Sequence, residues 1–235
     1  MTKLHLFAKP LFLTVIVFLI LYLVSGKNSL AASPQFLVSW QVENYAPAWY
    51  QGKIFPVKDT PIVVSFELIE NGRLVNLSNQ KIRWYINDDL VKNEDDGLGI
   101  KSIRFNIPDY RGRETTIKIV VWDYLAEALY KIVQIPVLSP EAVIDYPYPT
   151  KEINTGLSIF QVIPFFFNVQ SINDLAAEWS ANGEKAGEPG DNSWQLKLNI
   201  DSQTKSGTAV DLTTSINNPL QLLESATKSI HLQIK

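Results

Sequence analysis

The sequence predicts an all-β protein of two tandem β-sandwiches, preceded by an N-terminal apolar helix for export or anchoring. Three observations support this expectation. Short segments with alternating apolar and polar residues recur along the chain, helical periodicity is almost absent, and a pattern centred on a tryptophan recurs 95 positions later. The 235 residues, of which 46% are hydrophobic and 19% charged, are enough to bury one large core or two smaller ones.

The N-terminal segment has the features of an export signal. Lys3 and Lys9 precede an unbroken, mostly apolar run over 10–24, and small residues occupy the positions that a signal peptidase reads before a cut after Ala31. We expect 1–31 to be a cleaved signal peptide or an uncleaved membrane anchor, because 15 apolar residues are long for the first and short for the second. Both interpretations place the remaining chain outside the cytoplasm, either secreted or periplasmic after cleavage, or held by a transmembrane helix.

Alternating segments then follow one another to the C-terminus. In the first half the expected strands are 36–42, 61–69, 82–86, 103–107, 115–123 and 129–137. In the second half they are 157–169, the segment around Trp179, 194–200, 210–216 and 230–234. Asn71-Gly72 is a strong hairpin-turn pair after the second strand. Frequent short strands without helices favour a sandwich or a barrel over a parallel sheet.

An internal repeat sets the expected number of domains. The segments that begin at Trp84 and Trp179 share the pattern Trp-x-x-Asn-turn, and Gly112 and Gly207 lie at the same offset. Further pairs at this offset are Ile117 with Leu212, Val121 with Ile216, Ile135 with Ile230, and Val137 with Leu232. We therefore expect two sandwich domains of about 100 residues, 34–138 and 139–235.

These motifs resemble a known family. The first repeat contains the series Ile82-x-Trp84-x-Ile86-Asn87-Asp88, Phe105-x-Ile107-Pro108, Gly112 and Ile117-x-Ile119-x-Val121-x-Asp123. This series resembles bacterial extracellular immunoglobulin-like domains, closest to the PKD-like group, and the resemblance extends over 34–235. The second repeat departs from it where Asn218 and Pro219 stand in place of Asp123. The resemblance implies tandem immunoglobulin-like β-sandwich domains that act as spacers, adhesion modules or partner-binding units at the cell surface, without family-wide catalytic residues.

Several kinds of chemistry lack the residues they need. The chain has no Cys and only two His, which removes disulfides, Cys-ligated zinc and thiol nucleophiles. His231 alternates with apolar neighbours and is expected on the solvated face of the last strand. Without 1–31 the chain has 18 basic and 24 acidic residues, a net charge of −6, so nucleic acid is a poor partner and the membrane is contacted only through the N-terminal segment. We expect no enzymatic activity and no cofactor.

One acidic loop is a weak calcium candidate. Its carboxylates are Asp88, Asp89, Glu94, Asp95 and Asp96. Calcium takes six to eight oxygen ligands, and the spacing here does not follow the EF-hand pattern. A solvated loop is therefore the favoured interpretation, and a glycosidase pair would need a cleft that a loop at the end of a sandwich does not provide.

Aromatic residues beside prolines are the candidates for partner binding. Trp49 and Tyr50 lie in the long connection between the first two strands, and Tyr146 and Tyr148 lie at the entrance to the second domain. Phe165-Phe166-Phe167 cannot all face one core of a strand, because successive side chains alternate. Packing between domains, or protection of a sheet edge, is the favoured role of these rings, and partner binding is the alternative.

Two functions follow from these observations. The first is an exported, non-catalytic cell-envelope protein whose tandem domains bind, adhere to or space other proteins. The second is a carbohydrate-binding module, which would present two or three coplanar Trp or Tyr rings on one exposed face.

Overall fold

The computed structural model describes residues 33–124, 127–187 and 192–235, and every structural statement below concerns these residues. They form β-strands and two short 3₁₀ turns, which confirms the predicted all-β class. The expected export or anchor segment, 1–31, lies outside them. Within the described ranges no helix is long and apolar enough to cross a membrane.

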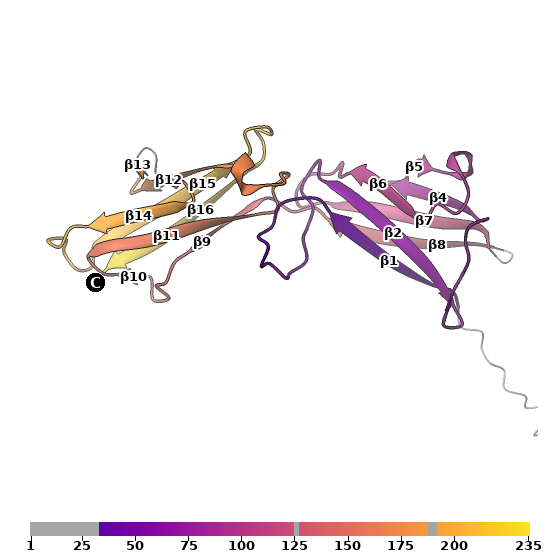
Figure 1. The fold of residues 1–235 in the computed structure, drawn as a ribbon, viewed down its shortest axis with the longest axis horizontal. Coiled ribbons are helices and arrows are strands. Elements are labelled where there is room, and N and C mark those ends of the chain that lie inside the picture. Colours follow the sequence, from indigo (N-terminus) through magenta and orange to yellow (C-terminus); the bar gives the residue numbers. More distant parts are fainter. Residues whose placement is uncertain (1–32, 125–126, 188–191) are drawn as a thin grey trace, which may run out of the picture. The chain divides into compact units, whose positions relative to one another are not determined.

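Each predicted segment contains a strand (Figure 1), but the strands Asp89–Lys92, Glu141–Asp145, Glu152–Ile153 and Glu184–Ala186 were not predicted, and the strand expected over 157–169 ends at Phe165. In the first half they are β1 (Gln35–Val42), β2 (Pro61–Glu70), β3 (Arg73–Leu74), β4 (Lys81–Ile86), β5 (Asp89–Lys92), β6 (Ser102–Asn106), β7 (Glu114–Tyr124) and β8 (Glu127–Pro136). In the second half they are β9 (Glu141–Asp145), β10 (Glu152–Ile153), β11 (Gly156–Phe165), β12 (Ala176–Ala181), β13 (Glu184–Ala186), β14 (Gln195–Ile200), β15 (Ala209–Asn217) and β16 (Ser225–Ile234). The 3₁₀ turns are η1 (Glu94–Asp96) and η2 (Ile172–Asp174).

The described chain separates into two compact units. Among the described residues the small unit comprises 33–35 together with Leu68–Val75, and the large unit comprises 36–67 and the residues from Asn76 onwards. In the small unit β3 folds back on the end of β2 around Asn71-Gly72, where both residues have positive φ. The predicted hairpin turn is therefore confirmed. All sites considered below lie in the large unit.

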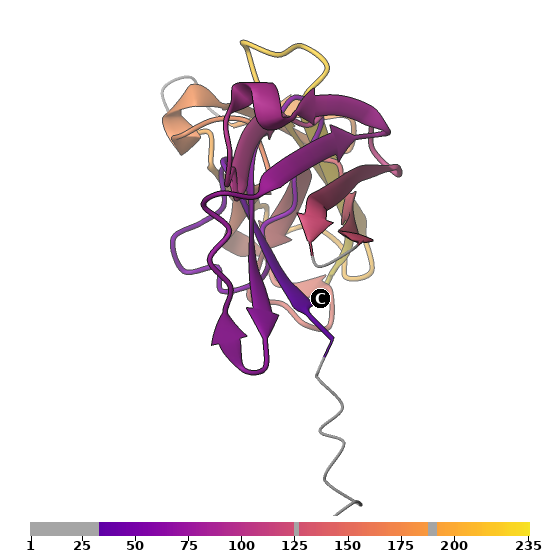
Figure 2. The same cartoon turned by 90° about the vertical axis from the view of Figure 1, so that its right-hand side faces the viewer.

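The strands of the two halves have the same order in their sheets (Figures 1 and 2). In the first half β1 and β6 both pair with β2, and the second sheet runs β5-β4-β7-β8. In the second half the sheets run β14-β11-β9 and β10-β16-β15-β12-β13. Apart from the short parallel strand β10, each strand of the second half has its counterpart in the first. In the lettering of immunoglobulin domains, β1-β2-β6 corresponds to A-B-E and β5-β4-β7-β8 to C′-C-F-G, which is the strand order of an immunoglobulin-like sandwich.

The two tryptophans of the repeat occupy matching buried positions. Trp84 in β4 is 0% exposed and Trp179 in β12 is 5% exposed. Their indole N–H groups donate to backbone carbonyls, at 2.8 Å to Ile100 and at 3.0 Å to Ser193. The ring of Trp84 also meets that of Phe66 edge-on, with centroids 5.6 Å apart.

The asparagine of the repeated pattern has the same role in both halves. Asn87 and Asn182 have φ of 47° and 51°, the left-handed conformation that asparagine tolerates in turns. The side-chain oxygen of Asn87 accepts from the backbone N–H of Thr116 at 2.9 Å, and that of Asn182 accepts from Asp211 at 2.9 Å. The pattern Trp-x-x-Asn therefore specifies a turn tied to the neighbouring strand.

The register of the last strand differs from the predicted repeat. Thr115 pairs with Ile135, and its counterpart Val210 pairs with Leu232, so Ile135 corresponds to Leu232 and not to Ile230. By the same shift Val137 corresponds to Ile234. The reason is that the chain between corresponding paired residues is two residues longer in the second half. Val121 pairs with Leu129, whereas its counterpart Ile216 pairs with Ala226.

Candidate functional site

The four aromatic candidates fall into two separate ring clusters. Trp49 is 63% exposed and its ring lies edge-on to Phe165, with centroids 6.1 Å apart. The half-buried ring of Tyr50 meets Phe165 at 5.3 Å and Phe166 at 6.1 Å. Trp49 is thus an exposed ring that rests on buried aromatic side chains.

Tyr146 and Tyr148 belong to the core of the second half. Both rings are half-buried and approach Phe160, at 6.3 and 6.2 Å between centroids. The Tyr148 hydroxyl also donates to Ser158 Oγ at 3.1 Å. Among the described residues no ring contact joins this pair to Trp49 and Tyr50, so the four side chains do not form one cluster.

The loop that carries Trp49 is held at several points. The backbone of Tyr45 exchanges two hydrogen bonds of 2.7 Å with Phe167 and Phe166, and the side chain of Asn44 donates to the carbonyl of Phe55 at 2.8 Å. Phe167 enters the core of the second half, whereas Phe165 and Phe166 pack with Val57 in a smaller cluster. The three successive phenylalanines therefore do serve two different cores.

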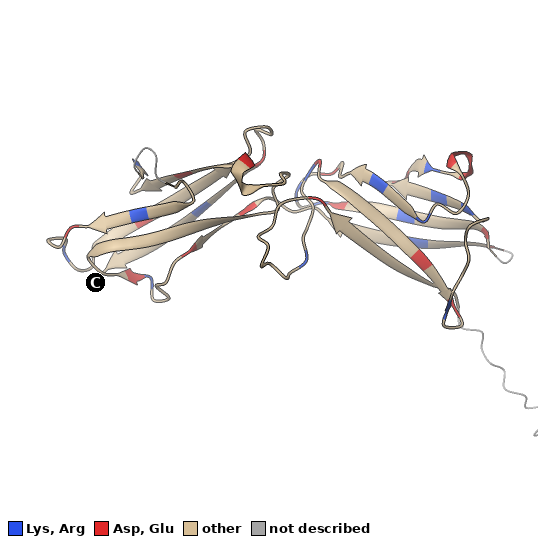
Figure 3. Cartoon of the chain, in the orientation of Figure 1, with Lys and Arg blue, Asp and Glu red and all other residues tan. Residues whose placement is uncertain are grey.

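The acidic loop is occupied largely by its own ion pairs and caps. Glu94 forms a bidentate pair with Arg83, whose guanidinium lowers the pKa of this carboxyl to about 2. Asp96 accepts from Lys92 at 2.8 Å, which lowers its pKa, and Asp95 accepts from the side chain of Asn93. Figure 3 shows the acidic residues gathered at this turn.

The calcium prediction gains no support from this geometry. In the part of the chain that the structure describes, no three His, Cys, Asp or Glu side chains converge as a metal site. Asp88 and Asp89 project at the tip of the β4–β5 hairpin and are exposed.

His231 lies on the exposed face of β16, as predicted, but it has a partner that sequence reasoning missed. Its Nδ1 contacts the carboxylate of Asp211, the residue directly opposite on β15. Both side chains are about 60% exposed, so this is a solvated cross-strand pair without a surrounding cleft.

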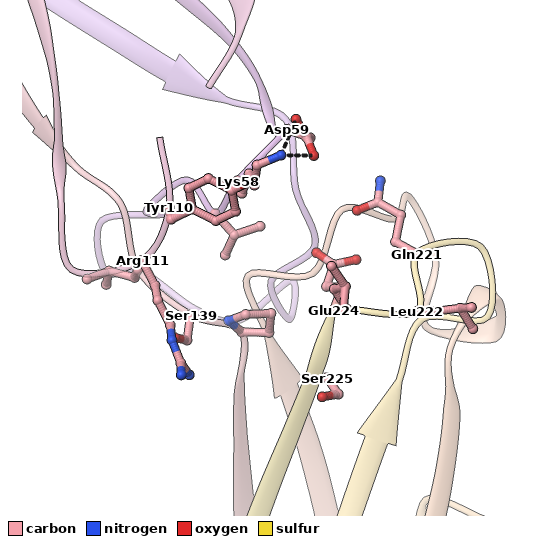
Figure 4. A pocket seen from close by; sticks show the side chains of 13 residues that line it. Lys58, Asp59, Tyr110, Arg111, Ser139, Gln221, Leu222, Glu224 and Ser225 are labelled. Carbon is pink, nitrogen blue, oxygen red and sulfur yellow. Dashed lines mark hydrogen bonds and ion pairs between the residues drawn. The ribbon is translucent and has the colours of Figure 1, made fainter. Parts of the chain in front are cut away.

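A cavity of about 840 Å³ lies beside the loop that joins β15 and β16 (Figure 4). Tyr110 and Arg111 line it, together with the segments Val57–Asp59, Leu138–Pro140 and Gln221–Ser225. Lys58 pairs with Asp59 at 3.2 Å and lies over the ring of Tyr110, 4.7 Å from its centroid. The sequence offers no signal for this cavity, because its walls come from four distant segments.

Glu224 anchors one wall of the cavity. Its carboxylate accepts from the backbone N–H of Asn168 at 2.7 Å and from the side chain of Asn218, which is itself buried. Burial raises the pKa of Glu224, although the two hydrogen bonds by themselves lower it. Glu224, at the end of the β15–β16 loop, is thus joined to Asn218 at the start of the loop and to the backbone of Asn168.

Sequence reasoning also missed an aromatic and cationic face on the sheet β5-β4-β7-β8. Register places Tyr85, Lys118, Trp122 and Tyr130 on the outer face, opposite the buried face that carries Trp84. The ammonium of Lys118 lies 5.5 Å from the ring of Tyr85 and 6.0 Å from that of Tyr130. Trp122 and Tyr130 are 39% and 64% exposed.

Comparison with known proteins gives no family assignment. The chain matches no known family and no curated protein. Among solved structures, three N-terminal domains of the Highly Immunogenic Outer Capsid protein of bacteriophage RB49 are similar with a TM-score of 0.43 and 13% identity, over 85% of this chain and 59% of that one. This chain thus spans less than two thirds of the phage chain.

Two further similar structures have lower TM-scores. The fibronectin(III)-like modules of Clostridium thermocellum CbhA have a TM-score of 0.28 and 11% identity, over 83% of this chain and 93% of that one. The Ig1-2 module of the Drosophila receptor protein tyrosine phosphatase DLAR has 0.27 and 12%, over 86% and 98%. The assignment of the fold as immunoglobulin-like rests on the strand order described above.

Proposed function

We propose that the chain is an exported, non-catalytic cell-envelope protein whose tandem immunoglobulin-like domains, 34–138 and 139–235, bind, adhere to or space other proteins. The PKD-like subgroup and the bacterial extracellular setting belong to the same proposal. The observation that carries it is Trp49, a 63% exposed ring that lies edge-on to the buried ring of Phe165, which in turn packs against Phe166.

Such a ring is well suited to a protein partner. A large aromatic side chain that is already held in place loses little conformational entropy when a partner covers it, and aromatic anchors dominate many protein interfaces. The supports of the loop, at Tyr45 and Asn44, keep this surface in one arrangement before binding.

Capture experiments with single variants test this function. With the full-length chain as bait for envelope proteins, Trp49→Ala should weaken capture by about thirtyfold, equivalent to about 2 kcal/mol, with an unchanged melting temperature. Tyr50→Ala is the matched packing control, because this ring contacts Phe165 and Phe166 and its loss should lower the melting temperature. If Trp49→Ala captured envelope proteins as strongly as the natural chain, the ring would not belong to the proposed interface.

Export has a separate test. Mass spectrometry of the protein from its native membrane or medium should find a mature N-terminus at Ala32 if the segment 1–31 is cleaved. An intact Met1, with protein that resists salt extraction from membranes, would assign an anchor instead. Recovery of the intact chain from the cytoplasm would contradict both.

Carbohydrate binding is the second candidate, and one observation favours it. The outer face of β5-β4-β7-β8 presents the exposed rings of Trp122 and Tyr130 together with Lys118, and flat rings on a sheet face stack against sugar rings. In affinity electrophoresis through polysaccharide gels, Trp122→Ala and Tyr130→Ala should abolish any retardation of the chain. Trp49→Ala should leave the retardation unchanged, which separates this function from the first.

A further inference from the structure

The loop between β15 and β16 exposes three leucines almost completely. Leu220, Leu222 and Leu223 are 86%, 90% and 98% exposed, within the connection that is longer than its counterpart in the first half. Single exposed apolar side chains are common on proteins, but three within four residues form a patch that association would bury favourably. We call residues 219–223 the leucine loop.

Hydrogen bonds brace the base of the leucine loop. The backbone N–H of Gln221 donates to the carbonyl of Asn218 at 3.1 Å, that of Glu224 donates to Gln221 at 2.8 Å, and that of Leu220 donates to the Asn218 side chain at 3.0 Å. Asn218 and Glu224 are themselves buried and bonded to each other. The leucines are therefore presented on a fixed base, and ordering them costs little on binding.

Arg111, a cation without an ion-pair partner among the described residues, lines the adjacent cavity (Figure 4). Arg111 lines the cavity and Arg113 follows it in the same turn, both exposed. Neither has an acidic partner among the described residues, whereas Lys58 is already paired with Asp59. A ligand for this surface, the leucine loop together with Arg111 and Arg113, needs an apolar part and a negative charge.

The chain itself carries a segment with this chemistry. At the tip of the β4–β5 hairpin, Asp88 and Asp89 are exposed and have no cationic partner among the described residues, and the exposed side chains of Leu90 and Val91 follow directly. Asn87 and Asp88 both have positive φ, so the strands reverse in a tight turn with Asp88 and Asp89 at its end, and Leu90 lies opposite Tyr85 on β4.

We propose that the hairpin tip 88–91 of one copy docks on the leucine loop and the Arg111–Arg113 turn of a second copy. Asp88 and Asp89 then meet the two arginines, and Leu90 and Val91 cover the exposed leucines. Because the two surfaces are different, the contact is head to tail and joins copies into an open chain rather than a closed two-fold dimer. This inference goes beyond the proposed function and does not depend on it.

The contact is small, and this sets its expected strength. A hairpin tip covers less area than a standard protein interface, so the dissociation constant should lie at about micromolar or weaker. Its charged part is exposed at the rim, so association should weaken as salt rises from about 0.05 to 0.5 M. Attachment of many copies to one surface would compensate for the weak single contact.

Cross-linking tests the contact directly, because the chain has no cysteine of its own. Full-length copies with Asp89→Cys are mixed with differently tagged full-length copies carrying Arg111→Cys and oxidised. The mixed disulfide should form, and it should not form when Lys185→Cys, at an exposed site on β13, replaces Arg111→Cys. Equal yields from both mixtures would show random collision and overturn the proposal.

Charge reversal supplies the second arm of the experiment. By light scattering at low salt, full-length Asp88→Lys/Asp89→Lys and Arg111→Glu/Arg113→Glu should each raise the dissociation constant of self-association at least about tenfold. Mixing the first variant with the second should restore association in alternating chains. The reversed tip of the first variant faces the reversed turn of the second, and the unchanged tip of the second faces the unchanged turn of the first. Self-association that survives both reversals would assign it to another surface.

A membrane is the competing occupant of the leucine loop, and the same variants distinguish it. Full-length Leu222→Ser/Leu223→Ser should lose self-association at an unchanged melting temperature, since both side chains are exposed. If this variant instead loses sedimentation with phosphatidylglycerol vesicles while keeping self-association, the loop binds lipid and the proposal is wrong.

Discussion

Replacement of Trp84 by Ala is the sharpest test of how the two halves fold. The side chain is 0% exposed, and a ring of this size buries about 150–250 Å². At about 25 cal/mol per Å² this is about 4–6 kcal/mol, of which Ala keeps a part, so the expected loss in unfolding free energy is about 3–5 kcal/mol. Trp84→Phe keeps most of the packing but leaves the Ile100 carbonyl without the indole donor, and should cost about 1–3 kcal/mol.

The assay must report each half separately. In hydrogen exchange followed by mass spectrometry, Trp84→Ala should increase exchange in β2, β4 and β7 while β11, β12 and β15 keep the protection of the natural chain. Trp179→Ala is the matched control and should show the opposite distribution, because the buried members of the apolar cluster around Trp179 lie, among the described residues, between Ala142 and Ile234, with Tyr45 packed against them.

A single outcome would refute the two-domain prediction. If both variants unfolded the entire chain in one transition with equal loss of protection in all strands, the halves would form one cooperative unit. The sequence repeat would then describe a shared sandwich geometry without independent folding.

Three further results are expected. Burial raises the pKa of Glu224, so its stabilising effect is full below the ordinary value of 4.5 and falls as pH rises through the folded-state pKa. The free energy of unfolding of the natural chain, measured by urea titration, should therefore rise as pH falls from about 7 to about 4. Glu224→Gln should make this rise smaller. The lowered pKa of Glu94 acts in the opposite direction: its contribution to the free energy of unfolding is present above pH 4.5 and should be lost as pH falls from about 4.5 to about 2. Glu94→Gln should remove this pH dependence. Gly99→Ala should lower the melting temperature more than Gly112→Ala, because both glycines have positive φ but only the first would press a Cβ to 2.8 Å from the backbone of Ser78.

Much of the fold follows from local sequence patterns. Alternation predicts most strands because one face of each is buried, and the pattern Trp-x-x-Asn predicts a mid-strand core residue followed by a left-handed turn. Trp84 and Trp179 fulfil this in both halves. These signals are readable because each depends on residues that are close together in the chain.

The features that sequence reasoning missed depend on residues that are far apart. Asp211 and His231 meet only through the register of β15 and β16, and the cavity takes its walls from four segments. The two-residue error at Ile230 has the same origin, because hydrophobic alternation has a period of two and a shift by two residues leaves the pattern unchanged. Only strand pairing distinguishes the two registers.

The two halves differ in the connection between their last two strands, where changes in sequence do not disturb the core. Strand order, the buried tryptophan and the asparagine turn recur, so packing constrains them equally in both halves. The β15–β16 connection is longer than its counterpart in the first half, and its leucines are almost fully exposed although a buried Asn218–Glu224 pair lies at its base. Exposed leucines on a rigid base do not stabilise the fold that carries them. Removal of these leucines from water in a contact with another molecule would be favourable in free energy, and this is the property that the loop adds.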